Sequence, residues 1–129
     1  MNRQIQPSSI APPAANYAHA ILSENPGTTL HISGQVAARP DGTIPDDVED
    51  QAAVVWSNIA AILAEAGMAM TDIVSVTTYV VVDFMACLPD VMAARDRAMA
   101  GHRAASTLVT VPALARPAWK MEVAVIAAR

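Results

Sequence analysis

Residues 73–82 read I-V-S-V-T-T-Y-V-V-V and give the strongest strand signal in the chain. Successive side chains of a strand point to opposite faces of a sheet. One face is then apolar and carries Val74, Val76, Thr78, Val80 and Val82. The other face is mixed and carries Ile73, Ser75, Thr77, Tyr79 and Val81. We expect the apolar face to pack on a core, and the mixed face to meet a subunit interface or a pocket wall rather than open water.

An amphipathic helix is predicted on each side of this strand. Residues 46–66 begin with an acidic cluster, which the positive end of a helix dipole favours. One helical face there is apolar, and its members are Val55, Ile59, Ile62, Leu63 and Ala66. A second helix is predicted over residues 88–100, with Pro89 near its first position and Gly101 at its end.

Four further strands are predicted from the remaining apolar runs. Residues 17–22 and 29–33 flank the turn-forming residues Glu24–Gly27 and are expected to pair as a hairpin. Residues 105–111 and 119–127 close the chain. The element order β-β-α-β-α-β-β predicts a two-layer α+β protomer, with a mixed sheet and two helices on one face.

The bulk composition indicates one domain over residues 1–129, with an irregular N-terminal arm at residues 1–16. Hydrophobic residues make up 53% of the chain, which makes an oligomer plausible for so short a protein. The net charge of -4 argues against nucleic-acid binding. No apolar run approaches the length of a membrane span, no secretory leader is recognised, and one cysteine fits a reducing cytoplasm.

Glu122 is the only charged residue of the final apolar run M-E-V-A-V-I-A-A, residues 121–128. Neither face of that strand looks solvated, so the carboxylate needs donors, a bound water or a proton. It is therefore a candidate for site chemistry. The alternative is a glutamate at a strand end that reaches water beside Lys120.

Several motifs together resemble the RidA/YjgF family over residues 17–127. They are the S-G-Q of residues 33–35, the V-T-T-Y-V of the strand quoted first, the A-S-T-L-V of residues 105–109 and the final M-E-V-A-V-I-A. Tyr17 in the first strand, and Gln51 and Asn58 in the first helix, also match. No single motif is specific, but their order and spacing are.

The resemblance implies a chorismate-mutase-like fold and a homotrimer whose ligand clefts lie between protomers. It also implies hydrolysis of reactive enamine and imine acids to 2-keto acids and ammonia. In the family, an arginine in the motif Pro-Ala-Arg-Ser binds the substrate carboxylate, and a glutamate of the last strand helps to position the attacking water. Glu122 matches that glutamate.

The sequence departs from the family at the arginine, because that position carries Ser106. A hydroxyl cannot offer a carboxylate a charged, bidentate pair of donors. Arg103 or Arg116 would have to supply the missing cation, and the sequence leaves both open. A second departure is Leu88, where typical members have an asparagine.

The remaining site candidates follow from the resemblance. Tyr17 would close the pocket, with hairpin packing as the alternative. Ser33 and Gly34 would admit a ligand beside the backbone, and Thr107 would line the pocket next to Ser106. Cys87 precedes a predicted helix start, where a reactive thiol is one interpretation and a small packed side chain is the favoured one. No metal site and no cofactor are expected.

Three functions stay open at this level. The first is a RidA-like hydrolase of a small enamine or imine, with Glu122 positioning water. The second is a non-catalytic trimer that binds or sequesters a small metabolite, because Ser106 replaces the arginine. The third, ribonuclease activity, is known in the wider family and has no support from this acidic chain.

Overall fold

The computed structural model describes all residues, 1–129. The strands are β1 (Asn2–Ile5), β2 (Ala20–Ser23), β3 (Thr29–Gln35), β4 (Ile73–Val81), β5 (Ala105–Val111) and β6 (Met121–Ala128). The helices are α1 (Val48–Glu65) and α2 (Leu88–Met99), and two short 3-10 helices, η1 (Met70–Asp72) and η2 (Val82–Cys87), flank β4. Neither α1 nor α2 is both long and apolar enough to cross a bilayer.

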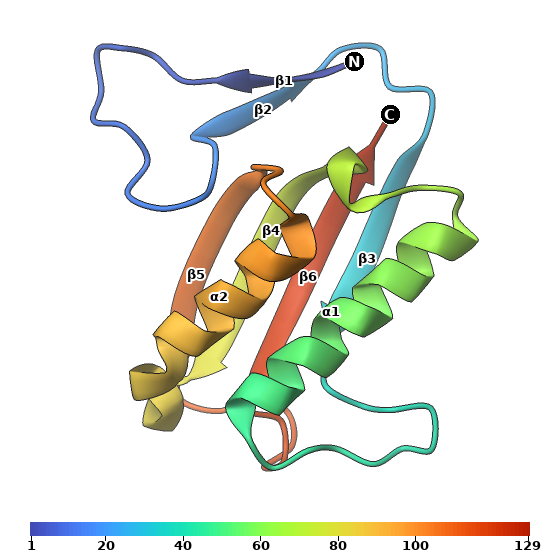
Figure 1. Ribbon diagram of the computed structural model, residues 1–129, viewed down its shortest axis with the longest axis vertical. Coiled ribbons are helices and arrows are strands. Elements are labelled where there is room, and N and C mark those ends of the chain that lie inside the picture. Colours follow the sequence, from blue (N-terminus) through green and yellow to red (C-terminus); the bar gives the residue numbers. More distant parts are fainter.

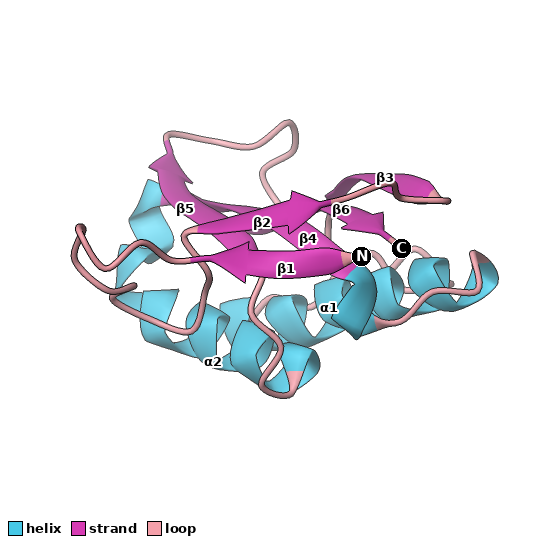
Figure 2. Cartoon of the chain, turned by 90° about the horizontal axis from the view of Figure 1, so that it is seen from above, coloured by secondary structure: helices cyan, strands magenta, loops and turns pink.

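Four strands form the main sheet in the order β3-β6-β4-β5. The β4–β5 pair is parallel and the other two pairs are antiparallel. Both helices cover the same face of this mixed sheet, and the opposite face is bare in the protomer (Figures 1 and 2). The sheet therefore has one face for the core and one face for other partners.

The core lies between the helices and the inner face of the sheet. The central strand contributes Val76 and Val80, each at most 1% exposed, as its alternation predicts. A register irregularity between Ile73 and Ser75 brings Ile73 to the buried side as well. From α1, the buried apolar face is made by Ala52, Val55, Trp56, Ile59 and Leu63.

The predicted helices are confirmed, with ends that differ slightly. The first begins at Val48 after the N-cap residue Asp47, and the second contains Pro89 in its first turn. The α2 helix ends at Met99, and its C-cap residue Ala100 has a left-handed φ of 48°, one residue before the predicted stop at Gly101. Cys87 is the half-buried N-cap residue of α2 and packs against the core.

The predicted hairpin of residues 17–22 and 29–33 is wrong. The β2 strand pairs with β1, in a region expected to be irregular, and β3 pairs with β6. The N-terminal strand is held by its own side chains, since Asn2 donates to the carbonyl of Ala128 and accepts from Ser23. The contact of Asn2 with Ala128 joins opposite ends of the chain, which local periodicity cannot reveal.

Gln51 connects α1 to the two loops at one end of the sheet. Its side chain is fully buried and donates to the carbonyls of Pro45 (2.8 Å) and Ala118 (2.9 Å). Its amide oxygen accepts from the backbone of Lys120 at 3.1 Å. This amide therefore fixes the backbone that leads directly into β6.

Candidate functional site

Glu122 is the second residue of β6 and points to the bare face of the sheet. The strand alternates as predicted: Met121, Val123 and Val125 are buried, whereas Glu122 and Ala124 are half-buried on the other side. The two ion pairs of the protomer are Arg3–Glu24 and Arg95–Asp96, so Glu122 is not paired with a cation. Its carboxylate oxygens are available to accept hydrogen bonds from a ligand or from water.

Gly34 makes room for this carboxylate. A Cβ atom placed on Gly34 would lie 2.0 Å from Oε1 of Glu122 and 2.7 Å from its Cδ. The approach occurs where the register of β3 against β6 shifts, between Ile32 and Gln35. Gly34 is thus required by the close approach of the Glu122 side chain, and Ser33 precedes it in the same irregular stretch.

Replacing Gly34 with alanine is expected to displace the Glu122 carboxylate with little loss of stability. The colliding atoms belong to the end of a flexible side chain, so they can move away while the strand persists. We expect any catalysis that depends on Glu122 to fall roughly 10- to 100-fold. The free energy of unfolding, measured in urea, should change by about 1 kcal/mol or less. Gly27→Ala is the matched control, because its Cβ would meet nothing closer than 3.7 Å. Equal effects of both substitutions would contradict this assignment.

Polar side chains of the neighbouring strands share the bare face with Glu122. Tyr79 of β4 is its cross-strand partner, and Thr77 lies two residues before Tyr79 on the same face. Thr107 of β5 is beside Thr77 in the parallel register. The structure therefore places Thr107 on the same face of the sheet as Glu122, two strands away, and adds Tyr79, which the sequence had placed only on a mixed face.

Ser106 does not share this face. The register of β5 places Ser106 beside Val76, whose side chain is buried under the helices. Neighbours in a parallel pair point to the same side of the sheet. Within one protomer, the expected contact of Ser106 with a ligand beside Glu122 is therefore not met, and Thr107 occupies the corresponding place.

Tyr17 lies at the outer edge of β5. Ala18 forms a parallel bridge with Ala105, and its amide donates to the carbonyl of Ala104 at 2.9 Å. The Tyr17 hydroxyl accepts from the amide of Ala14 at 3.3 Å. Val109 is the residue of β5 that is level with Glu122. Ala105 lies four residues before Val109, which is roughly 13 Å along the strand. Tyr17 and Glu122 are consequently not brought together within one protomer.

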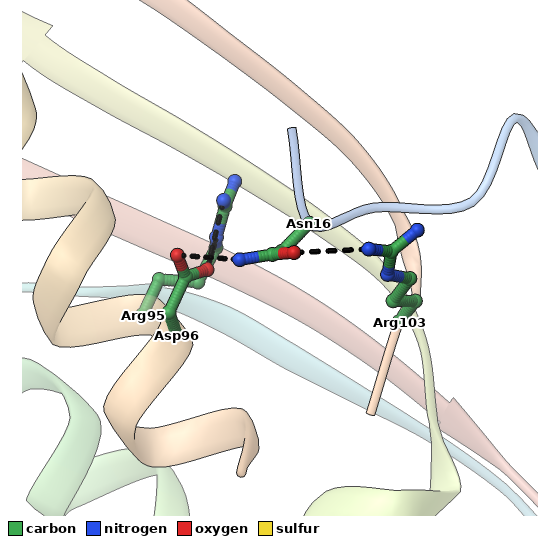
Figure 3. Close-up of polar contacts among 4 residues, drawn as sticks. All are labelled: Asn16, Arg95, Asp96 and Arg103. Carbon is green, nitrogen blue, oxygen red and sulfur yellow. Dashed lines mark hydrogen bonds and ion pairs between the residues drawn. The ribbon is translucent and has the colours of Figure 1, made fainter. Parts of the chain in front are cut away.

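Arg103 is held at this same edge by a directional chain of hydrogen bonds (Figure 3). It donates to Oδ1 of Asn16 at 3.0 Å, and the Asn16 amide donates to Asp96 at 3.0 Å. Asp96 also accepts two hydrogen bonds from Arg95, which is nearly buried. Arg103 lies six residues before Val109, the residue of β5 that is level with Glu122, which is a separation of roughly 20 Å along the chain. It therefore fastens the N-terminal arm and does not supply a cation beside Glu122 of its own protomer.

Asp96→Asn is expected to loosen the arm, because Asp96 accepts from Arg95 through Oδ1 and from Asn16 through Oδ2. An amide at this position has only one oxygen and presents a donor to the other neighbour. We expect the Ala18 amide to exchange its hydrogen roughly tenfold faster, as the loss of one hydrogen bond implies. The double variant Asn16→Asp with Asp96→Asn restores an acceptor for both neighbours and should restore protection. Unchanged exchange in the single variant would show that the chain of bonds does not hold the arm.

Arg116 lies at the same end of the sheet as Glu122. It belongs to the loop that joins β5 to β6, and its guanidinium lies over the ring of Trp119, 5.3 Å from the ring centroid. Of the two arginines left open by the sequence, Arg116 is the one near the candidate site.

The protomer contains four cavities, and Glu122 lines none of them. No group of three or more His, Cys, Asp or Glu side chains is arranged to hold a metal ion. The candidate site is thus an open, polar strip on the bare sheet face, with one free carboxylate, a phenol and two threonine hydroxyls. Such a strip can orient a water molecule but cannot enclose a substrate without a covering surface.

Residues 8–129 match the family model described as Endoribonuclease L-PSP. The chain belongs to this family, also known as the Rid or YjgF family. The Rid protein YyfB of Yersinia pestis has the same fold along 99% of this chain and 98% of its own, with a TM-score of 0.90 and 32% identity. These matches confirm the family resemblance and the two-layer α+β fold class inferred from the sequence.

Two Escherichia coli Rid relatives match over shorter stretches. The RutC family protein YjgH is 41% identical over 63 residues, and TdcF, named as a candidate reactive intermediate deaminase, is 38% identical over 55 residues. These stretches cover 46% and 43% of the relatives, so the chain spans about half the length of the curated relatives that it matches. The solved structure of YjgH aligns with 90% of this chain and 92% of its own, with a TM-score of 0.70 and 31% identity.

Proposed function

We propose that this Rid protein is a deaminase that hydrolyses small reactive imines, and enamines after their tautomerisation, to carbonyl compounds and ammonia. The observation that carries the proposal is the Glu122 carboxylate, which lies against Gly34 without a cation partner and faces the bare side of the sheet. The match to TdcF, whose name assigns it to reactive intermediates, supports the same chemistry.

The proposed reaction begins with the imine protonated on nitrogen, and Glu122 accepts a proton from a water molecule as the oxygen adds to the carbon of the C=N bond. The product of this step is a neutral carbinolamine. Glu122 then returns that proton to the nitrogen. The C–N bond breaks as the hydroxyl oxygen forms the C=O bond, and Glu122 takes the hydroxyl proton and passes it to the departing ammonia, which leaves as ammonium. General acid–base catalysis of this kind contributes about 10²- to 10⁴-fold to a rate.

A covering surface completes the proposed site. We propose that three copies associate through their bare sheet faces, so that Glu122 of one protomer meets the arm region of another. This arrangement would bring together Tyr17 and Glu122, which are separated in the single protomer. TdcF has been solved with serine bound, and a small amino-acid derivative is the ligand class that we transfer to this chain.

The test measures ammonia release from freshly generated imines. An amino-acid oxidase produces 2-iminopropanoate and related imines in situ, and the decay of each is followed with and without the protein. We expect acceleration over buffer for at least one imine, proportional to protein concentration. Decay at the buffer rate for every imine would contradict the proposal.

Metabolite binding without catalysis is the second candidate. Two observations favour it: Arg103 is engaged by Asn16, and Ser106 lies on the helix side of the sheet. A thermal-shift screen with keto acids, amino acids and aromatic acids tests it, because a ligand of the native state raises stability. Ribonuclease activity is not proposed, since 8 Lys and Arg residues are outnumbered by 12 Asp and Glu residues.

A further inference from the structure

A cavity of about 480 Å³ lies between the β5–β6 loop and η2. Val81, Phe84, Leu114 and Trp119 contribute apolar wall, and Asp83 and Arg116 contribute charge. Its volume falls in the range of small-molecule sites, which combine apolar walls with a few convergent polar groups. In Figure 2 the β5–β6 loop projects on the side of the sheet away from the helices. Glu122 points to that side as well, since its neighbours Met121 and Val123 are buried on the helix side.

The guanidinium of Arg116 has N–H donors in this cavity that are not engaged in an ion pair. The ring of Trp119 supports its guanidinium from one side through a cation–π contact, and Arg116 belongs to neither ion pair of the protomer. A guanidinium is planar, so its N–H groups match the two oxygens of a carboxylate, and the aromatic ring beneath it helps to hold it in position. Arg116 is therefore presented as a receptor for a carboxylate.

Asp83 supplies the opposite charge. It lines the same cavity but forms no ion pair with Arg116. Lys120 does not neutralise it either, because its ammonium donates to the carbonyl of Asp46 and lies over the ring of Phe84. The cavity thus offers one free cation and one free anion beside an apolar wall.

We propose that this cavity binds α-amino and α-imino acids with apolar side chains. Arg116 binds the carboxylate, Asp83 binds the positively charged nitrogen, and the wall of Phe84 and Trp119 receives the side chain. A ligand with only one of these charges would pair with one of the two protein charges and leave the other without a partner.

The cavity adjoins the candidate site. Val81 is two residues beyond Tyr79 on β4, roughly 7 Å away, and Trp119 is three residues before Glu122. An imino acid held by Arg116 would therefore lie at the Glu122 end of the sheet. The placement of an imino acid beside Glu122 rests on the proposed function, and it narrows the substrates to imines of apolar amino acids. Binding of the amino acid itself does not depend on catalysis.

Trp119 fluorescence tests the binding directly. The protein has two tryptophans, and the other, Trp56, is buried in the core and gives a constant background. The probes are L-leucine, isopentylamine and 4-methylpentanoate, which differ only in their charged groups. We expect saturable binding of L-leucine, at least tenfold tighter than either singly charged probe. No saturation by L-leucine up to roughly 10 mM, or equal affinity for all three probes, would overturn the proposal.

Variants at the two charged positions, Arg116 and Asp83, assign the charges. Arg116→Ala should weaken L-leucine binding roughly tenfold or more. Arg116→Lys should have an intermediate effect, because lysine keeps the positive charge but not the bidentate pair of N–H donors. Asp83→Asn should weaken L-leucine binding and leave 4-methylpentanoate binding unchanged or improved. Arg97→Ala, at an exposed position of α2, is the matched control and should bind as the parent does. Unchanged L-leucine binding in both Arg116→Ala and Asp83→Asn would overturn the assignment.

The same variants separate this inference from the proposed function. If imines are hydrolysed and Arg116→Ala leaves KM for the leucine-derived imine unchanged, the cavity is not the substrate site and the deaminase proposal stands. If L-leucine binds through Arg116 but no imine is hydrolysed, the binding site stands and the deaminase proposal fails.

Discussion

Glu122→Gln is expected to lower kcat for imine hydrolysis by about 10²- to 10⁴-fold. Glutamine has nearly the same shape and still fits against Gly34, but its amide cannot take a proton from water. KM should change by less than about threefold, since the substitution removes proton transfer and leaves the ligand contacts in place. Initial rates of ammonia release over a range of imine concentrations give both quantities.

The control for this substitution is Glu49→Gln on the exposed surface of α1, which removes the same charge away from the sheet. It should retain the rate of the parent protein. A Glu122→Gln variant with kcat within threefold of the parent would show that another group activates the water. Tyr79, the cross-strand partner of Glu122, would then be the next group to test.

Gln51→Glu is expected to lower the free energy of unfolding by about 3 kcal/mol or more. The fully buried amide donates to two backbone carbonyls, and a carboxylate in its place would present an acceptor to both. An ionised carboxylate there would also be desolvated without a cation. Urea denaturation followed by circular dichroism gives the free energy of unfolding.

Gln51→Met distinguishes the two contributions, because it removes the hydrogen bonds without adding a charge. It should cost less than Gln51→Glu and more than the surface control Gln4→Glu, which lies exposed on β1. Since Gln51 fixes the backbone of Ala118 and Lys120, both core variants should also weaken the site at the start of β6. Stability equal to that of the parent in Gln51→Glu would contradict this account.

Much of the protein follows from local sequence patterns. The alternation in residues 121–128 predicted that Glu122 lies on the opposite face from Val123. The helical spacing of residues 55–66 predicted the buried side of α1, except that Ile62 is half-buried and Ala66 is exposed beyond the end of the helix. Gly34 was expected to allow close backbone approach, and the structure shows the Glu122 carboxylate there. Gln51 and Asn58 were recognised as matching positions, and both side chains bind backbone carbonyls.

Other features depended on how distant segments pair. The face occupied by Ser106 was decided by the parallel register of β5 on β4, which no local pattern of residues 105–111 encodes. The fate of Arg103 was decided by Asn16 and Asp96, which lie 87 and 7 positions away in the sequence. The pairing of β1 with β2 was missed because residues 2–5 have no apolar alternation.

The amino-acid sequence by itself determined the family, the order of the main helices and strands, and the side of the last strand that carries Glu122. These are properties of neighbours within a turn of helix or two residues of a strand, where backbone geometry alone dictates direction. Only the tertiary structure decided that Thr107 rather than Ser106 joins the bare face, and that Arg103 is engaged while Arg116 is free beside a cavity. Such outcomes depend on strand register and loop packing, in which residues far apart in the chain compete for the same partners.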